Sequence, residues 1–257
     1  MTFDLSSAPI VRLAWERGLG LPEGSLVMGR DGSRITHATD DGRLTFVRLW
    51  EQSILTGPPA VLEAARAHTD DELSDHAVML RLTRGFGGRG RGTQALYFAD
   101  ELDVRQPAGS IMVSHGNPEA VALESMCPPD DVNDVGLAAL PHKFTLMGLP
   151  GQGGDRGADW DGDPQEAAHS AGPVACSAYA EFQGLLARLG TLVAPAHRNQ
   201  GLGLLATSIA AHEALAAGLI VQWRADINNA PAHALAMAAG LSVAGLQTTV
   251  DLHTPHK

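Results

Sequence analysis

A glycine-rich segment in the C-terminal third carries the residues whose types and spacing best suit chemistry. It reads Arg198-Asn199-Gln200-Gly201-Leu202-Gly203 and follows an apolar run that ends at Val193. Periodicity predicts a helix over residues 201–217. Glycines at a helix start expose backbone N–H groups, and the helix dipole adds positive potential there. With the cation of Arg198 beside them, these amides form a predicted pyrophosphate site.

The same glycines also fit a dinucleotide-binding fingerprint. Gly201, Gly203 and Ala206 satisfy G-x-G-x-x-A, and Asp226 ends the next predicted strand about 20 residues further on. That fingerprint follows its strand almost at once, however, whereas seven residues lie between Val193 and Gly201. Only 31 residues follow Asp226, too few for the rest of a doubly wound domain. A glycine-rich helix start without any ligand is a further alternative.

The elements around this loop predict a mixed α/β layer, in the order strand, strand, helix, strand, helix, strand. A hairpin-like connection at 181–184 joins the first two strands. The predicted strands are Pro173–Tyr179, Leu185–Val193, Ile220–Arg224 and Ser242–Leu252, and the second helix is Ala230–Ala239, closed by Gly240.

The preceding part of the chain is predicted to hold a smaller α/β domain over residues 1–115, with a second domain, which carries the glycine-rich loop, over 116–257. Residues 150–170 are rich in Gly, Asp and Pro and are predicted as a long polar loop. Thr69 to Glu72 form a predicted capping box before a helix near 73–80. The Gly-Arg stretch 84–92 is predicted as a flexible connection rather than an anion or RNA contact. The remaining predicted helices are Val11–Gly18, Val61–His68 and Asp131–Leu140, with 120–127 either helical or a strand end, and the strands are Leu44–Leu49, Ser53–Thr56, Ala95–Phe98 and Phe144–Leu149.

Composition narrows the partners. The chain has 257 residues, is 44% hydrophobic and carries a formal charge of −11. Such a surface repels phosphate backbones, which disfavours nucleic acid and weakly favours encounter with amines. Cys127 and Cys176 show no metal or redox spacing, so reduced cytoplasmic thiols are expected.

Membrane and metal sites are not predicted either. The first residues lack a basic region followed by an apolar core, so no secretory signal is expected. The apolar stretch 202–221 contains His212 and Glu213 at its centre, which predicts a buried helix and strand rather than a span. Acids alternate at 159–163, but a calcium loop started at Asp155 or Asp159 lacks the required glycine at its sixth position.

The motifs together resemble a known family. The run LGTLVAPAHRNQGLG resembles motif A of the GNAT superfamily of acyl-CoA-dependent N-acyltransferases, whose loop reads R/Q-x-x-G-x-G/A. Asn229, followed eleven residues later by Gly240, resembles motif B. The resemblance implies a GNAT-like central mixed, mostly antiparallel sheet flanked by helices. It also implies an N-acetyltransferase that transfers an acetyl group from acetyl-CoA to the primary amine of a small molecule by direct attack on the thioester.

The resemblance also assigns roles to residues. It implies that the pantetheine arm pairs with the strand 189–193, that Asn229 contacts this arm, and that backbone N–H near Val193 polarises the thioester oxygen. The strands 185–193 and 220–224 should splay apart. The implied cofactor-binding residues are Leu192, Val193, Arg198, Asn199, Gln200, Gly201, Leu202, Gly203 and Asn229.

Catalytic residues are less well defined. Many family members have a tyrosine seven residues after the motif B asparagine, where this chain has Ala236. Glu181 and Tyr179 are the candidate catalytic residues, with Glu124 as a third. A catalytically silent coenzyme A-binding module, with the N-terminal domain as recognition unit, is the alternative function. The residues expected to be structural are Cys176, His197, His212 and His233. The acceptor amine and the oligomeric state are not predicted.

Overall fold

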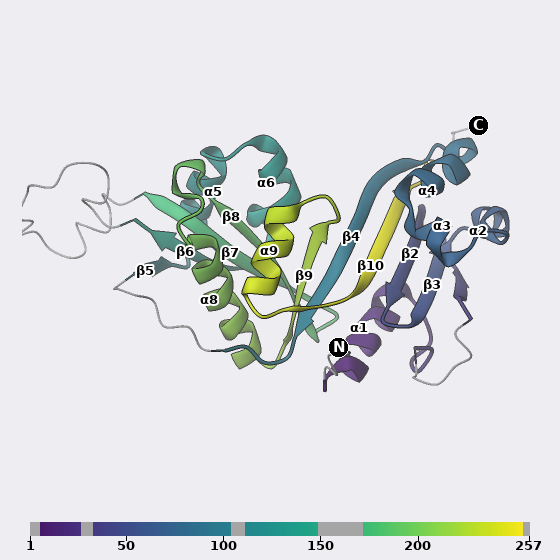
Figure 1. The fold of residues 1–257 in the computed structure, drawn as a ribbon, viewed down its shortest axis with the longest axis horizontal. Helices are drawn as coiled ribbons and strands as arrows, with labels where there is room; N and C mark the ends of the chain where they lie inside the picture. The colour runs from purple at the N-terminus through teal and green to yellow at the C-terminus, as the bar shows by residue number, and fades with distance from the viewer. Residues whose placement is uncertain (1–5, 27–32, 104–110, 149–171, 254–257) are drawn as a thin grey trace, which may run out of the picture.

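The computed structural model describes residues 6–26, 33–103, 111–148 and 172–253, which form a ten-stranded sheet with helices on both faces (Figure 1). The mixed α/β class is as predicted. In their order across the sheet, the strands are β1 (Ile35–Ala38), β3 (Gln52–Gly57), β2 (Arg43–Leu49), β10 (Ser242–Asp251), β4 (Arg89–Ala99), β9 (Ile220–Asp226), β8 (Leu186–Val193), β7 (Pro173–Phe182), β6 (His142–Met147) and β5 (Met112–Ser114). Among these described strands, only the pairs β1–β3 and β8–β9 are parallel.

Four α-helices, α1 to α4, lie near the N-terminal strands, and the others accompany the C-terminal strands. The α-helices are α1 (Ala8–Leu19), α2 (Pro59–Ala65), α3 (Asp70–Ser74), α4 (His76–Thr83), α5 (Asn117–Ser125), α6 (Pro129–Val135), α8 (Leu202–Ala216) and α9 (Ala230–Ala238). Short 3₁₀ turns are η1 (Arg84–Phe86), η2 (Leu137–Ala139) and η3 (Pro195–His197).

One face of the sheet, the α8 face, is covered by α8 and α9 at one end and by α2, α3 and α4 at the other (Figure 1). Alternate strand residues point to opposite faces, so Trp223 and Leu189 face α8 while their neighbours face away. The buried residues Ala206, Ala210 and Ala214 are small, which lets α8 lie close to the strands.

The opposite face, the α1 face, is covered in two separate patches. Helix α1 buries Trp15 against Val47, Leu96 and Phe98 of the central strands. Helix α5 and turn η2 bury Cys176 and other apolar residues of β7 and β8. The part of the α1 face between these two patches carries polar side chains of β8 and β9.

The sheet runs continuously through the predicted domain boundary near residue 115. Strand β4 lies on the N-terminal side of that boundary, yet it pairs with β9 and β10 from the C-terminal side. Figure 1 shows β4 and β10 as long neighbouring strands in the middle of the molecule. The division into domains at 1–115 and 116–257 therefore stays a prediction, while the strands of the two parts are interleaved.

Most predicted elements near the loop are observed within a few residues, and the capping box of Thr69 and Glu72 is confirmed. The helix predicted near 73–80 is instead two helices, because Asp75 adopts an extended conformation and caps α4. The prediction of a flexible connection over 84–92 is wrong, because Arg89–Gly92 belong to β4 and pair with β10. Strands β1 and β5 were not predicted. The polar loop 150–170 and its acids lie outside the described residues.

Candidate cofactor-binding site

The loop after β8 has a well-defined backbone path. Turn η3 follows the strand, Arg198 is extended, and Asn199 has a φ of 60°, a left-handed conformation that asparagine tolerates. Gly201 has a φ of 78° and stands immediately before the first residue of α8. The chain thus turns twice through left-handed backbone in order to direct the start of α8.

The N-terminus of α8 has free backbone donors. Its cap residue Gly201 offers no side-chain hydrogen bond, and no acidic residue lies in the first turn. The first intrahelical bond that involves the cap runs from the N–H of Leu205 to the carbonyl of Gly201, at 3.0 Å. The N–H groups before Leu205 are therefore available to an anion, and the dipole of a fifteen-residue helix favours one there.

The two glycines of the motif serve different purposes. A Cβ on Gly201 would meet no atom within 4 Å, so the positive φ is what requires glycine at this position. A Cβ on Gly203 would lie 3.1 Å from a methyl group of Val193. Gly203 therefore allows close packing of α8 on β8, whereas Gly201 shapes the surface that a ligand would reach.

Arg198 is not a free cation. Its Nη2 lies 2.6 Å from the Oδ2 of Asp131 on α6, and its Nε donates to the carbonyl of Val193 at 3.3 Å. Both members of this ion pair keep about two-fifths of their side-chain surface exposed, with values of 42% and 41%. Arg198 therefore lies beside the loop, where a cation was predicted, but the carboxylate of Asp131 offsets part of the charge of Arg198.

Strands β8 and β9 separate next to this loop. Their parallel pairing covers 186–189 of β8 and 220–223 of β9, and its last pair is Leu189 with Trp223. Both strands continue beyond that pair, to Val193 and Asp226. These ends, 190–193 and 224–226, do not pair with each other, and we call them the strand fork. The predicted splaying of these two strands is therefore present.

Backbone groups of β8 face into the strand fork. The N–H of Ala194 donates to the carbonyl of Val174 on β7, at 3.0 Å. Because hydrogen-bonded and non-bonded pairs alternate in an antiparallel ladder, the N–H groups of Val193 and Thr191 point away from β7. An extended chain lying beside β8 would find these donors, which fits the predicted pantetheine pairing and the predicted oxyanion contact.

Asn229 stands at the start of α9. Its Oδ1 accepts a hydrogen bond from the N–H of Ala232 at 3.1 Å, so it acts as an N-cap. Asp226 precedes it at the end of β9 and accepts from the backbone and side-chain amides of Asn228. Asn229 lies next to the strand fork, and its contact with a cofactor stays a prediction.

Residue 236, where many members of the resembled family have a tyrosine, lies in the hydrophobic core. Ala236 lies on the buried face of α9 and is fully buried in the same cluster as Trp223. A different tyrosine reaches α9 from β4: the hydroxyl of Tyr97 lies 2.5 Å from Nδ1 of His233. Burial raises the pKa of Tyr97. His233 is therefore partly satisfied, as expected of a structural histidine, although its buried Nε2 has no partner among the described residues.

Of the candidate catalytic residues, Tyr179 lies beside the base of the strand fork, and Glu181 lies toward the closed end of the β8–β9 pair. Tyr179 is buried and stacks on His142, with ring centroids 4.4 Å apart. Burial, followed by the charges of nearby acids, raises its pKa. Glu181 pairs with Ala187, six strand residues or about 20 Å from Val193. Tyr179 is the register partner of Leu189, the last β8 residue paired with β9, whereas Glu181 lies away from the strand fork. The catalytic roles of both residues stay predictions.

The other reactive side chains have structural partners. Glu124 accepts a hydrogen bond from the N–H of Ala138 and so links α5 to η2. Cys176 is buried in the cluster beneath α5, and burial raises the pKa of its thiol, which confirms a core role. His212 contacts the carbonyl of Asp103. Within the described ranges, no group of three or more His, Cys, Asp or Glu residues could hold a metal ion, and no helix is long and apolar enough to cross a membrane.

The structure adds polar residues that the sequence reasoning did not single out. Arg188 on β8 and Gln222 and Arg224 on β9 lie on the α1 face beside the strand fork. The available signal was polar residues at alternate positions, 222 and 224, in an otherwise apolar strand, because such residues share a face.

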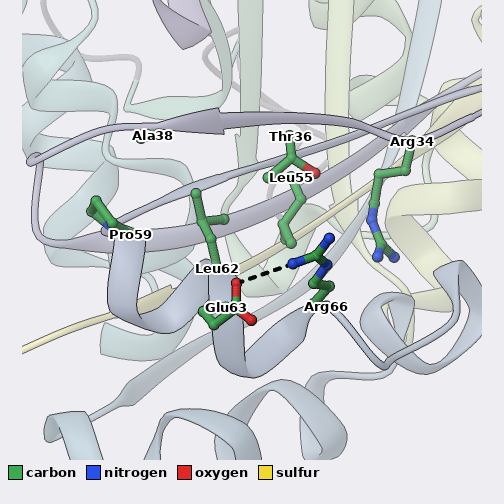
Figure 2. Close-up of a pocket in the computed structure, with 8 residues that line it drawn as sticks. All are labelled: Arg34, Thr36, Ala38, Leu55, Pro59, Leu62, Glu63 and Arg66. Carbon is green, nitrogen blue, oxygen red and sulfur yellow. Dashed lines mark ion pairs between the residues drawn. The ribbon is translucent and has the colours of Figure 1, made fainter.

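A pocket of about 400 Å³ lies elsewhere, between β1, β3 and α2 (Figure 2). Arg34 and Arg66 flank it, and each is paired with an acid: Arg34 with Asp70 at 2.9 Å and Arg66 with Glu63 at 3.6 Å. It is formed by elements far in the sheet order from the strand fork. Its cations are already neutralised, and we assign it no role in the chemistry of the loop.

No protein-family model matches this chain, and no curated protein matches its sequence. Solved structures are similar to it at low sequence identity. A GNAT-family acetyltransferase from Colwellia psychrerythraea is 16% identical, with a TM-score of 0.43 over 67% of this chain and 60% of its own. A putative GNAT acetyltransferase from Novosphingobium aromaticivorans is 18% identical, with a TM-score of 0.43 over 65% of this chain and 69% of its own. A GCN5-related N-acetyltransferase from Kribbella flavida is 18% identical, with a TM-score of 0.43 over 69% of this chain and 63% of its own.

Proposed function

We propose that this chain is a GNAT-type N-acyltransferase that transfers an acetyl group from acetyl-CoA to the primary amine of a small molecule. The observation that carries the proposal is the strand fork, which opens beside an uncapped helix N-terminus. One site therefore offers amides for a pyrophosphate and, within the same strand, amides for an extended arm. A dinucleotide would use only the first of these.

The residues divide the work as follows. The N–H groups at the start of α8 bind the pyrophosphate, and Arg198 adds charge from the side. The N–H groups of Thr191 and Val193 hold the pantetheine arm and polarise the thioester carbonyl. The neutral amine attacks the carbonyl carbon, the C–N bond forms, and the C–S bond breaks to release the thiolate. The amine's surplus proton passes to water or to the thiolate.

The alternative is a catalytically silent module that binds coenzyme A. A specific observation favours it: Ala236 is buried, so no side chain there can protonate the thiolate. A thiolate is a good leaving group that needs little protonation, however, and this is why the transferase is our first choice.

The test is a comparison of binding and turnover in the full chain. We expect calorimetry to show coenzyme A binding, and thiol release from acetyl-CoA to depend on an added primary amine. Binding without turnover on a broad amine panel would favour the silent module. A thermal shift with NAD(P) and none with coenzyme A would refute the acyl-CoA site altogether.

A further inference from the structure

The α1 face of the sheet has a polar strip between its two apolar patches. Helix α1 covers Leu186 and Ile220 at one side, and α5 with η2 covers Leu192 at the other. The residues between them on β8 and β9 are Arg188, Gln222 and Arg224. A sheet face that is apolar on both sides and cationic in the middle is not explained by core packing.

The two arginines lie close together without a compensating acid. Gln222 is the register partner of Arg188, and Arg224 is two residues further along β9 on the same face, so their Cα atoms are about 8 Å apart. No carboxylate of the described residues forms an ion pair with either guanidinium, although both α6 and β9 carry acids nearby. Arg188 is partly buried, and a guanidinium partly removed from water without a paired acid is costly, which points to an anion supplied from outside the chain.

The surroundings of each guanidinium support this. Burial, together with the charge of Arg224, lowers the pKa of Arg188 to about 9, which leaves it charged at neutral pH. Its guanidinium lies 3.3 Å from the ring centroid of Phe182, so the group is held in place. Arg224 has a lowered pKa through desolvation but keeps an exposed side chain. Because its side chain is exposed, Arg224 can be reached by a ligand from solution.

Gln222 supplies an independent sign of a missing ligand. Its side chain is fully buried, and its Oε1 accepts a hydrogen bond from the Nε of Arg188 at 3.1 Å. Its Nε2 has no hydrogen-bond partner among the described residues. A buried amide donor without a partner costs about as much as a lost hydrogen bond. An oxyanion held by the arginines would accept from it as well.

The strip lies where the reaction would take place. Arg188 precedes the last paired residue of β8, and Arg224 is the first residue of β9 beyond the pairing. The thioester, lying along Thr191 and Val193, would end at the base of the strand fork, where Leu189 pairs with Trp223. Asp226 lies two residues beyond Arg224 on the same face, about 7 Å further along β9. Asp134 of α6 is close enough for the charge of Asp226 to raise its pKa, after burial as the larger cause.

We propose that this strip is the acceptor site and that the acceptor is a small amine carrying a carboxylate, of the amino-acid class. Arg188, Arg224 and Gln222 bind the carboxylate, and the amine lies toward Asp226 and Asp134, next to the thioester. Paired guanidinium groups match the two oxygens of a carboxylate. This proposal rests on the proposed function, since it names the substrate class of the same site.

The experiment compares matched acceptors in the thiol-release assay: β-alanine, propylamine and 2-aminoethylphosphonate. We expect β-alanine to exceed propylamine by about 10–100-fold in kcat/KM, the value of a charge-assisted hydrogen bond or two. Arg224→Gln and Arg188→Gln should each remove most of this preference, mainly through KM. The control Arg66→Gln changes the exposed arginine that follows α2 as its C-cap and should keep the preference. Arg224→Glu should instead favour propane-1,3-diamine.

Each outcome decides something. Equal use of propylamine and β-alanine by the wild type, or an unchanged preference in both arginine variants, would overturn the proposal. A higher kcat/KM for 2-aminoethylphosphonate than for β-alanine would replace carboxylate by phosphonate-type anions and overturn the amino-acid class. Coenzyme A affinity, measured in parallel, separates the two proposals, because its absence in the wild type refutes the proposed function. If coenzyme A binds without turnover, a thermal shift with β-alanine that Arg224→Gln abolishes supports the site, and no shift refutes it.

Discussion

Two regions of this molecule are built to attract anions, and they use opposite means. The loop before α8 offers backbone amides at a helix N-terminus, and its one cation, Arg198, is exposed and paired with Asp131. The strip on β8 and β9 offers two guanidinium groups and a buried amide, with no paired acid among the described residues. The loop is made from backbone, the strip from side chains.

This difference indicates which of the two regions can select among ligands. Backbone amides at a helix start recognise any phosphate group and depend on chain geometry, so substitution of the loop's side chains should matter little. Side-chain cations in a sheet depend on residue identity and carry a cost when empty. The loop therefore suits a common cofactor, and the strip suits a particular acceptor.

The largest effect is expected from the backbone of the loop. Gly201→Val places a β-branched residue at a φ of 78°, which costs about 2 kcal/mol and forces the loop to another conformation. We expect coenzyme A affinity to fall at least about 100-fold by calorimetry, because the amides no longer converge.

Gly218→Val is the matched control. Gly218 has a φ of 81° at the other end of α8, and its Cβ would also meet nothing within 4 Å. Both variants should lose similar stability in urea unfolding, but only Gly201→Val should lose affinity. Equal affinities in the two variants would show that the loop amides do not form the phosphate site.

Sequence reasoning reached the loop because its signals are local. The glycines, the helix periodicity and the apolar run before them lie within about 30 residues of one another, and α8, β8 and β9 lie where they were predicted. The interleaving of strands was out of reach. Strand β4 owes its extended Gly-Arg segment to β10, about 160 residues away, and no local pattern specifies that pairing.

The acceptor strip was missed for a related reason. Arg188 and Arg224 are 36 residues apart, and only the register of β8 on β9 brings them together. The pairing of Arg198 with Asp131 is equally non-local. Of the candidates chosen by family position, Tyr179 pairs with Leu189 at the base of the strand fork, and Glu181 lies toward the closed end of the strands. Local sequence therefore predicted the backbone-built site, and tertiary pairing determined the one built from side chains.

A smaller effect, on stability, distinguishes the strip from the loop. Arg188→Met removes a partly buried charge and keeps most of the volume beside Phe182, so we expect a gain of about 1 kcal/mol at pH 7.5. The pKa of Arg188 is about 9 in the folded state and ordinary in the unfolded state. Above pH 9 the unfolded chain binds more protons, so wild-type stability gains there and the variant's advantage shrinks.

Urea unfolding of both proteins at pH 7.5 and pH 10 measures this difference, with Arg198→Met as the control. Arg198 is exposed, so its removal should change stability by less than about 0.5 kcal/mol at either pH. A loss of stability in Arg188→Met at pH 7.5 would mean that its contacts with Gln222 and Phe182 outweigh the cost of its charge. The strip would then be a structural feature without need of an anion.

The smallest effect, on coenzyme A affinity, is expected from the charge of Arg198 beside the loop. Asp131→Asn removes the acid that offsets Arg198, so coenzyme A should bind about 2–5-fold more tightly at low salt, within the range of exposed ion pairs. The gain should vanish near 0.5 M salt, where exposed charges are screened, and it should be absent from the double variant Asp131→Asn with Arg198→Gln. Weaker binding in Asp131→Asn would give the acid the opposite role, that of holding Arg198 in position. The loop would then depend on a side-chain arrangement after all, and the contrast between the two regions would be one of degree.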